Sequence, residues 1–259
     1  MLVFGAVLFI LLLLAAIAGW WVQLHTRNAT HADLIWAWGL GAAALAWLVA
    51  GDGELLPRIA AGILVAVWSL RLGLHILGRI VSEPEDGRYQ ALRVRLGDRA
   101  PLWLLPLFLV QAPLAWFFSL PFMVLAGHPG GDAIAWVLVG FLLGIFALAG
   151  EALADHQLAR FRADPANGGR TCRQGLWRYS RHPNYFFEWL HWCSYPLMAT
   201  GAPGGAWVWL APVVMFAFLW WITGIPWTEQ QAVRSRGEDY RRYQRETPIF
   251  FPWRPKHDH

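Results

Sequence analysis

LVFGAVLFILLLLAAIAGWWV, residues 2–22, decides the fold, because this uncharged apolar run has the length of roughly 20 residues that an α-helix needs to cross a bilayer. No positively charged segment precedes it and no small-residue cleavage site follows it, so we predict a transmembrane helix rather than a cleaved signal peptide. The whole chain agrees: 57% of its 259 residues are hydrophobic and 15% are charged, whereas a soluble domain has roughly 25% charged residues. The sequence therefore predicts an all-α, polytopic membrane protein.

Further apolar runs follow the first, and together they predict a bundle of about seven transmembrane helices. No repeat, low-complexity stretch or linker divides the chain, so residues 1–259 are expected to form a single membrane domain. The predicted spans are 2–22, 34–51, 58–80, 102–126, 132–155, 183–201 and 206–228.

Basic residues alternate along the chain in a way that predicts topology. Arginines are concentrated in segments 82–100, 160–181 and 234–256, whereas segments 127–132 and 201–206 contain neither Lys nor Arg. Because Lys and Arg accumulate on the cytoplasmic side, we predict an outside N-terminus and a cytoplasmic C-terminus, in the inner membrane of a bacterium. Arg58, in a short loop beside Asp52 and Glu54, is the one basic residue that runs against this pattern.

Charged residues inside predicted spans are the best pointers to a site, because they are costly in lipid and usually face a cavity or a partner. Arg71, His75 and Arg79 are spaced four and four apart, so they share one helix face. Snorkelling to the interface accounts for Arg79 but not for Arg71, which lies two turns deeper. We therefore favour a polar cavity beside this face.

The fifth and sixth spans carry further polar residues at helical spacing. Glu151 and Asp155 lie four apart and Arg162 follows seven residues later, while Asn184 and Glu188 share a face of the sixth span. We interpret Glu188, about one turn inside an apolar run, as a functional carboxylate. Near the start of the second span, Asp33 can be either an N-cap carboxylate or part of a site.

Several common site classes are missing from the sequence. It contains no Gly-x-Gly-x-x-Gly, Walker or His-Glu-x-x-His motif and no convincing set of metal ligands, so no metal is expected.

Cys172 lies in a basic loop and Cys193 in an apolar run, so a disulfide between them is not expected. No stretch alternates strand and helix, so any nucleotide must be held by membrane helices and basic loops. No nucleic-acid partner and no particular oligomeric state are predicted.

GLWRYSRHPNYFFEWLHW, residues 175–192, closely resembles the signature of the membrane sterol reductases and steroid 5-alpha-reductases. Over most of its length the chain also resembles the bacterial steroid-5-alpha-reductase-like membrane family. The features shared with that family are Asp33-x-x-Trp36, Trp68-x-x-Arg71-Leu72, His75, Arg79, Glu85-Asp86-x-Arg88-Tyr89, Arg236-Gly-Glu-Asp-Tyr240-x-x-Tyr243 and Phe251-Pro252.

This resemblance implies that residues 132–259 bind NADPH and that residues 1–126 enclose an apolar substrate. Asp155 and Arg162 match an Asp and an Arg seven apart in the steroid reductases, and Asn184 and Glu188 match an Asn and a Glu four apart. Arginine forks suit a pyrophosphate and a 2′-phosphate. The implied cofactor-binding residues are Asp155, Arg162, Arg173, Arg178, Arg181, His182, Asn184, Tyr185, Glu188, Trp192, Glu229, Arg234 and Tyr240.

The implied reaction is reduction of a carbon–carbon double bond in a steroid- or isoprenoid-like lipid that enters from the bilayer, with a 3-oxo-4-ene steroid as the type case. The catalytic candidates are Tyr89, Asp33, His75 and Glu54, and the substrate-binding candidates are Trp36, Arg71 and Arg79. Tyr89 is predicted to donate to the substrate oxygen, oriented by Asp33 or by the Arg71–His75–Arg79 face, unless it is an interfacial tyrosine. The family's Gln-Glu pair is missing, since no Gln precedes Glu54.

Three other functions fit parts of the sequence. Arg181-His182-Pro183-x-Tyr185 also occurs in the isoprenylcysteine carboxyl methyltransferases, which use S-adenosylmethionine and share a late Glu and a Tyr-x-x-Tyr tail; Asn184, Glu188 and Trp189 favour the reductase. A lipid- or sterol-binding membrane protein without activity would not need Asn184 and Glu188. A proton-coupled transporter should show paired repeats, which the sequence lacks.

Overall fold

A computed structural model of the protein describes residues 1–256; about 80% of the chain is helical and no strand occurs among these residues. The predicted all-α fold is therefore confirmed. The chain divides into two compact units: unit 1 comprises residues 1–137 and 199–208, and unit 2 comprises residues 138–198 and 209–256. The assignment of substrate and cofactor to separate halves of the chain stays a prediction.

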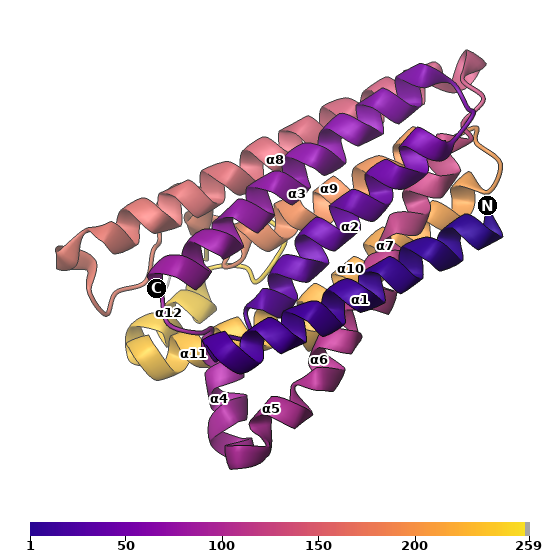
Figure 1. The fold of residues 1–259 in the computed structure, drawn as a ribbon. Helices are drawn as coiled ribbons and strands as arrows, with labels where there is room; N and C mark the ends of the chain where they lie inside the picture. The colour runs from indigo at the N-terminus through magenta and orange to yellow at the C-terminus, as the bar shows by residue number, and fades with distance from the viewer. Residues whose placement is uncertain (257–259) are drawn as a thin grey trace. The chain divides into compact units, whose positions relative to one another are not determined.

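Unit 1 is built around α2, which packs against α1, α3 and α7. A short excursion between α3 and α7 (Figure 1) consists of α4 and three smaller helical pieces. The bounds are α1 Leu2–Thr26, α2 His31–Ala50, α3 Leu55–Ser82, α4 Gly87–Leu96, η1 Gly97–Arg99, α5 Ala100–Trp103, α6 Leu105–Leu109, α7 Gln111–Ala126 and η2 Gly131–Ala133.

Unit 2 contains most of the long α8, the short α9, and a C-terminal series in which α10 packs on α9 and α11 packs on α12. The π-helical turn η6 joins α10 to α11. The bounds are α8 Ile134–Ala163, η3 Pro165–Asn167, η4 Gly175–Arg178, α9 Pro183–Met198, η5 Gly205–Trp209, α10 Leu210–Ala217, η6 Phe218–Ile222, α11 Ile225–Arg236 and α12 Glu238–Glu246, with η5 lying mostly in unit 1.

The number of spans differs from the prediction. Six helical segments among residues 1–256 are long and apolar enough to cross a membrane, and the predicted sixth span, 183–201, is not one of them. Its helix, α9, has 16 residues and is about 24 Å long at 1.5 Å per residue. Pro183 suits the first helical position. Pro196 lies inside the last turn and removes one backbone hydrogen bond there.

Although α9 is short, it runs back along α8. A Cβ atom on Gly140 of α8 would lie 2.6 Å from the carbonyl oxygen of Ser194, and a Cβ atom on Gly150 would lie 2.4 Å from the ring of Phe187. The two helices are therefore antiparallel and in close contact, and α9 passes over the apolar part of α8. Most of its residues are buried, so protein covers α9 along much of its length and it does not need a full apolar span.

This antiparallel passage leads to a topological prediction. If α9 carries the chain back across the bilayer, the basic loop before it and the basic C-terminal tail lie on the same side, and the positive-inside rule makes that side cytoplasmic. We expect a reporter fused to the C-terminus to be active only in the cytoplasm. A reporter fused in the loop 127–131 should show the opposite activity. A periplasmic C-terminus would contradict this topology.

Arg58, the exception to the charge pattern, has a local role in unit 1. Its Nε donates to the carbonyl of Leu48 at 2.7 Å, and one terminal nitrogen donates to that of Val49 at 3.1 Å. These carbonyls lie at the C-terminal end of α2, where a cation stabilises the helix dipole.

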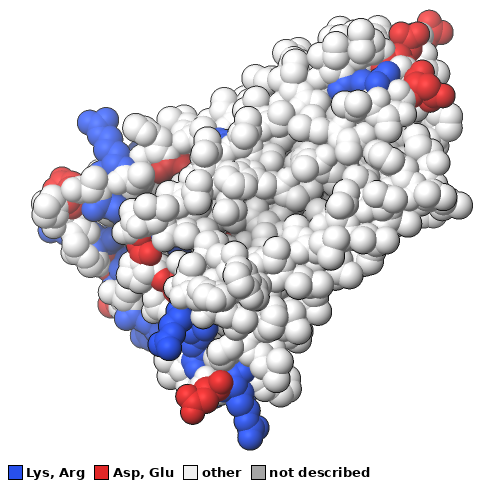
Figure 2. Space-filling view, viewed as in Figure 1, with Lys and Arg blue, Asp and Glu red and all other residues white. Residues whose placement is uncertain are grey.

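Figure 2 shows that the viewed face of unit 1 is almost free of charged side chains along its helices, as a lipid-facing surface should be.

Candidate functional site

Polar residues of unit 1 meet at the start of α2. The carboxylate of Asp33 accepts from Tyr89 Oη at 2.7 Å and from a terminal nitrogen of Arg88 at 2.8 Å. Thr30 occupies the N-cap of α2, so Asp33 binds these side chains rather than capping the helix. Arg88 also donates to Asp86 at 2.9 Å, and Asp86 pairs with Arg79 at 3.1 Å. We refer to Asp33, Arg79, Asp86, Arg88 and Tyr89 as the Asp33 network.

The Asp33 network holds the loop between α3 and α4 against α1 and α2. Within that loop, Glu85 accepts from the backbone N–H of Ala29 at 2.6 Å and from Arg93 at 2.8 Å, and Arg93 reaches Gln23 of α1 at 2.8 Å. The ionised groups are thus paired, which offsets the cost of partial burial. The segment Glu85-Asp86-x-Arg88-Tyr89, noted in the sequence for its family resemblance, is where these contacts converge.

Tyr89 is buried, and its ring packs with Ala32, Leu104 and Phe108. Burial raises the pKa of Tyr89 well above its usual range, and the nearby charge of Asp33 raises it further. The phenol therefore keeps its proton, and in this arrangement it donates that proton to Asp33. The structure brings Tyr89 and Asp33 together, one of the two arrangements that the sequence left open, but Tyr89 must turn away from Asp33 before it can donate to a substrate.

The other predicted residues of unit 1 lie apart from this pair. Glu54 is exposed at the start of α3, beyond the far end of α2, about 25 Å from Asp33 along that helix axis. His75 is exposed, and Arg71 is half-buried on the same helix. Trp36 packs edge-on against Trp68 with ring centroids 5.4 Å apart. Of the Arg71–His75–Arg79 face, Arg79 alone belongs to the Asp33 network.

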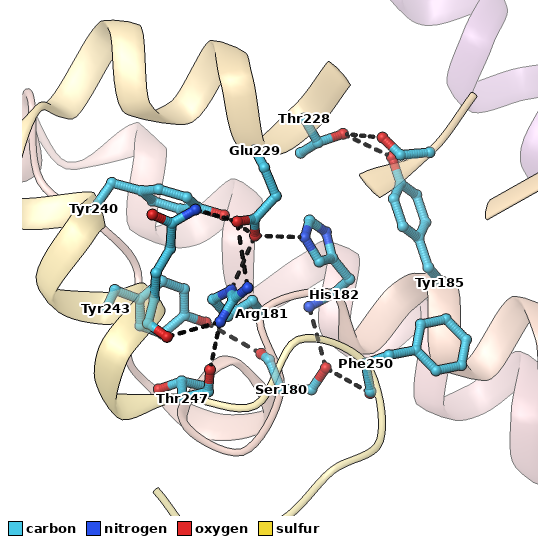
Figure 3. Close-up of polar contacts among 12 residues, drawn as sticks. Ser180, Arg181, His182, Tyr185, Thr228, Glu229, Tyr240, Tyr243, Thr247 and Phe250 are labelled. Carbon is cyan, nitrogen blue, oxygen red and sulfur yellow. Dashed lines mark hydrogen bonds and ion pairs between the residues drawn. The ribbon is translucent and has the colours of Figure 1, made fainter. Parts of the chain in front are cut away.

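A second polar cluster lies in unit 2 and is centred on Glu229 of α11 (Figure 3). Its carboxylate accepts from Arg181 Nε at 2.9 Å, His182 Nε2 at 2.9 Å, Tyr240 Oη at 2.7 Å and the side-chain amide of Gln244. We refer to these five residues as the Glu229 network. A carboxylate offers about four lone pairs, so these donors use the acceptor sites of Glu229.

The Glu229 network ties the loop before α9 to the end of the chain. Arg181 also donates to the carbonyls of Gln244 at 2.9 Å and Thr247 at 2.8 Å. Ser180 Oγ donates to the carbonyl of Phe250 at 2.8 Å (Figure 3), and the backbone of Arg181 donates to Pro248 at 2.9 Å. A terminal nitrogen of Arg181 also donates to Glu229 at 3.3 Å, so four of its five guanidinium donors are used within the protein.

His182 and Tyr185 flank this cluster. Burial lowers the pKa of His182 and outweighs the opposite effect of the Glu229 carboxylate. At neutral pH the imidazole is therefore uncharged, with its proton on Nε2, because a carboxylate can only accept. The rings of His182 and Tyr185 stack with centroids 5.3 Å apart, and Tyr185 Oη lies 3.1 Å from Thr228 Oγ1 (Figure 3).

The residues matched most specifically by the family resemblance also meet in unit 2. Asn184 donates to Asp155 of α8 at 3.2 Å, so these two predicted contacts are adjacent. One turn further along α9, Glu188 is buried and accepts from Trp192 Nε1 at 2.9 Å. The pairing of Asn184 with Asp155 depends on the antiparallel packing of α8 and α9, which glycine residues make possible.

The predicted arginines fall into different environments. Arg173 forms ion pairs with Asp239 at 3.1 Å and Glu246 at 3.0 Å, so carboxylates of α12 already balance its charge. Arg162, Arg178 and Arg234 are exposed.

The sequence analysis did not identify Gln244, whose side-chain amide donates to Glu229. Its position four residues after Tyr240, on the same face of α12, is the signal that could have identified it.

The part of the chain that matches a known protein family contains both the Asp33 network and the Glu229 network. Residues 19–247, from α1 to just beyond α12, match the family described as "Protein of unknown function (DUF1295)". The chain is also similar to the uncharacterized protein C594.04c of Schizosaccharomyces pombe, with 28% identity over 278 residues that cover 93% of this chain and 78% of the relative. No solved structure matches the chain.

Proposed function

Because the chain belongs to the DUF1295 family, a membrane family related to the steroid 5-alpha-reductases, we propose that it is a membrane reductase that uses NADPH. Its substrate is the carbon–carbon double bond of an apolar, steroid- or isoprenoid-like lipid. The observation that carries the proposal is the bond between Asn184 and Asp155 of two packed helices, with Glu188 buried one turn further along α9. These are the residues through which the chain resembles the cofactor-binding half of the steroid reductases.

The donor set of unit 2 suits a dinucleotide. Asn184 and the carboxylate of Asp155 can bond hydroxyl and amide groups, and Glu188 is a buried acceptor beside Trp192. Exposed arginines such as Arg162 and Arg178 match phosphates in charge and geometry. When bound, NADPH supplies the hydride for the reduction.

In unit 1, we assign the other half of the reaction to Tyr89 and Asp33. Hydride transfer to the beta carbon of a conjugated enone leaves negative charge on the carbonyl oxygen, and a hydrogen-bond donor placed there lowers the barrier. A proton must then reach the alpha carbon to complete the reduction. Tyr89 keeps its proton at neutral pH because burial and Asp33 raise its pKa. By turning from Asp33 toward the substrate oxygen, Tyr89 would act as that donor, and Arg88 would continue to balance the charge of Asp33.

Cofactor binding tests the proposal directly. We expect Asn184→Ala and Glu188→Ala each to weaken NADPH binding by more than about tenfold, because each removes a polar contact and leaves its partner unsatisfied. The measurement is calorimetric titration of the purified protein in detergent. Cys193→Ala, a buried substitution on the same helix, is the matched control and should bind NADPH normally. Unchanged affinity in both polar variants would refute this cofactor assignment.

A second candidate function is methyl transfer from S-adenosylmethionine. The Glu229 network favours it, since it joins Arg181 and His182 to a late Glu and to Tyr240 of the Tyr-x-x-Tyr tail, which are the features shared with the isoprenylcysteine carboxyl methyltransferases. The same titration separates the two functions. Tight binding of S-adenosylmethionine, with no binding of NADPH, would replace the reductase with the methyltransferase.

A further inference from the structure

A cavity of about 210 Å³ lies in unit 2, between the end of α8 and the loop that follows it. A water molecule occupies about 30 Å³ in the liquid, so the cavity has room for a group several times larger. Three of the side chains that line it carry a positive charge. The polar and glycine residues of its wall that matter here are Arg162, Asp164, Gly169, Arg170, Cys172 and Arg236.

The charge balance of this region singles out two of the arginines. Arg173 and Arg181 are neutralised by Asp239, Glu246 and Glu229. Within residues 1–256, no carboxylate lies within ion-pair distance of Arg170 or Arg236. The guanidinium of Arg236 instead lies over the ring of Tyr240, 5.6 Å from its centroid.

The nearby carboxylates are engaged elsewhere. Asp164, in the cavity wall, accepts from the backbone N–H of Ala166 at 2.9 Å and caps a short helical turn. Asp239, whose pKa Arg236 helps to lower, accepts from the backbone of Thr171 at 2.7 Å and pairs with Arg173. Gly169, at a φ of 73°, turns the loop so that Arg170 and Cys172 line the same cavity. The cavity therefore has an excess of guanidinium groups.

We propose that this cavity binds the 2′-phosphate of the dinucleotide, and that Arg170 and Arg236, with Arg162, make the protein select NADPH over NADH. The inference rests on the proposed reductase function. A phosphate monoester carries close to two negative charges and several acceptor oxygens, which guanidinium forks match. Arg162 lies seven residues beyond Asp155, about 10 Å further along α8. One helix thus leads from the Asp155–Asn184 pair to the cavity, as an extended ligand requires.

The test compares NADP⁺, NAD⁺ and 2′-AMP by calorimetric titration of the full chain in detergent. We expect Arg170→Gln and Arg236→Gln each to lower the affinity for NADP⁺ at least about tenfold, because a charge-assisted hydrogen bond is lost. The affinity for NAD⁺, which lacks the 2′-phosphate, should stay within about twofold. Arg241→Gln is the matched control: it removes an exposed arginine of α12 outside the cavity and should change neither affinity.

Each other outcome has a separate meaning. Equal losses of NADP⁺ and NAD⁺ affinity, or no loss of either, would overturn the 2′-phosphate site but leave the reductase proposal standing. If the wild type binds neither dinucleotide yet binds 2′-AMP through Arg236, the reductase proposal fails and the phosphate monoester site is supported. If phosphatidic acid in mixed micelles displaces 2′-AMP at lower concentrations than NADP⁺ does, the cavity belongs to a lipid headgroup and our inference is overturned.

Discussion

Replacing Glu229 with alanine is expected to lower the free energy of unfolding by about 3–5 kcal/mol, because the change removes one partner of a buried ion pair and leaves the other charge uncompensated. The side chains of Arg181 and Glu229 are 10% and 13% exposed. The substitution also deprives His182, Tyr240 and Gln244 of their acceptor. Denaturation of the purified protein in detergent measures the loss.

Glu238→Ala is the control for this result. Glu238 also pairs with an arginine, Arg245, at 3.0 Å, but its side chain is 69% exposed. An exposed pair contributes roughly 0–1 kcal/mol because water screens it. We therefore expect Glu238→Ala to leave stability nearly unchanged. If the two substitutions destabilise the protein equally, the Glu229 network is not the link that holds the end of the chain to the loop before α9.

Tyr89→Phe is expected to lower the turnover of a 3-oxo-4-ene steroid, or of another isoprenoid enone, about a hundredfold while the affinity for NADPH barely changes. The substitution keeps the ring that packs with Ala32, Leu104 and Phe108 and removes only the hydroxyl. Asp33 still pairs with Arg88, so the loss of stability should be about 1 kcal/mol. Turnover with saturating NADPH, together with a binding titration, separates catalysis from cofactor affinity.

Ser119→Ala is the matched control for the loss of a buried hydroxyl in unit 1, since Ser119 accepts from Trp47 Nε1 at 3.2 Å. It should cost similar stability without slowing turnover. If Tyr89→Phe turns over the enone as fast as the wild type, Tyr89 is a packing residue and another group stabilises the charge on the substrate oxygen. A protein that binds NADPH but reduces no enone would direct the search to a different lipid substrate.

The fold was predictable because composition and apolar length alone specify membrane helices. The short length of α9 could not be predicted. A short helix is tolerated there because α9 is buried against α8, and that burial depends on glycines of α8 that lie more than 35 residues away in the chain. The family resemblance implied that Asp155 and Asn184 both contact the cofactor, and the structure brings the two side chains into contact. The environments of Arg173 and Arg181 could not be predicted, since their carboxylate partners lie 48 to 73 residues further along the chain.

Segment 248–253 has a consequence for biosynthesis. Ser180 and its acceptor Phe250 are 70 residues apart, so a ribosome that adds 5–20 residues per second needs roughly 4–14 s to make the second after the first. Within that interval Glu229, Gln244 and Thr247 are made in turn, so Arg181 gains its partners before Ser180 gains Phe250. Segment 248–253 therefore joins this part of unit 2 after α11 and α12 have been made. A chain that stopped after Thr247 would contain every helix and the Arg181–Glu229 pair, but Ser180 would lack its acceptor Phe250.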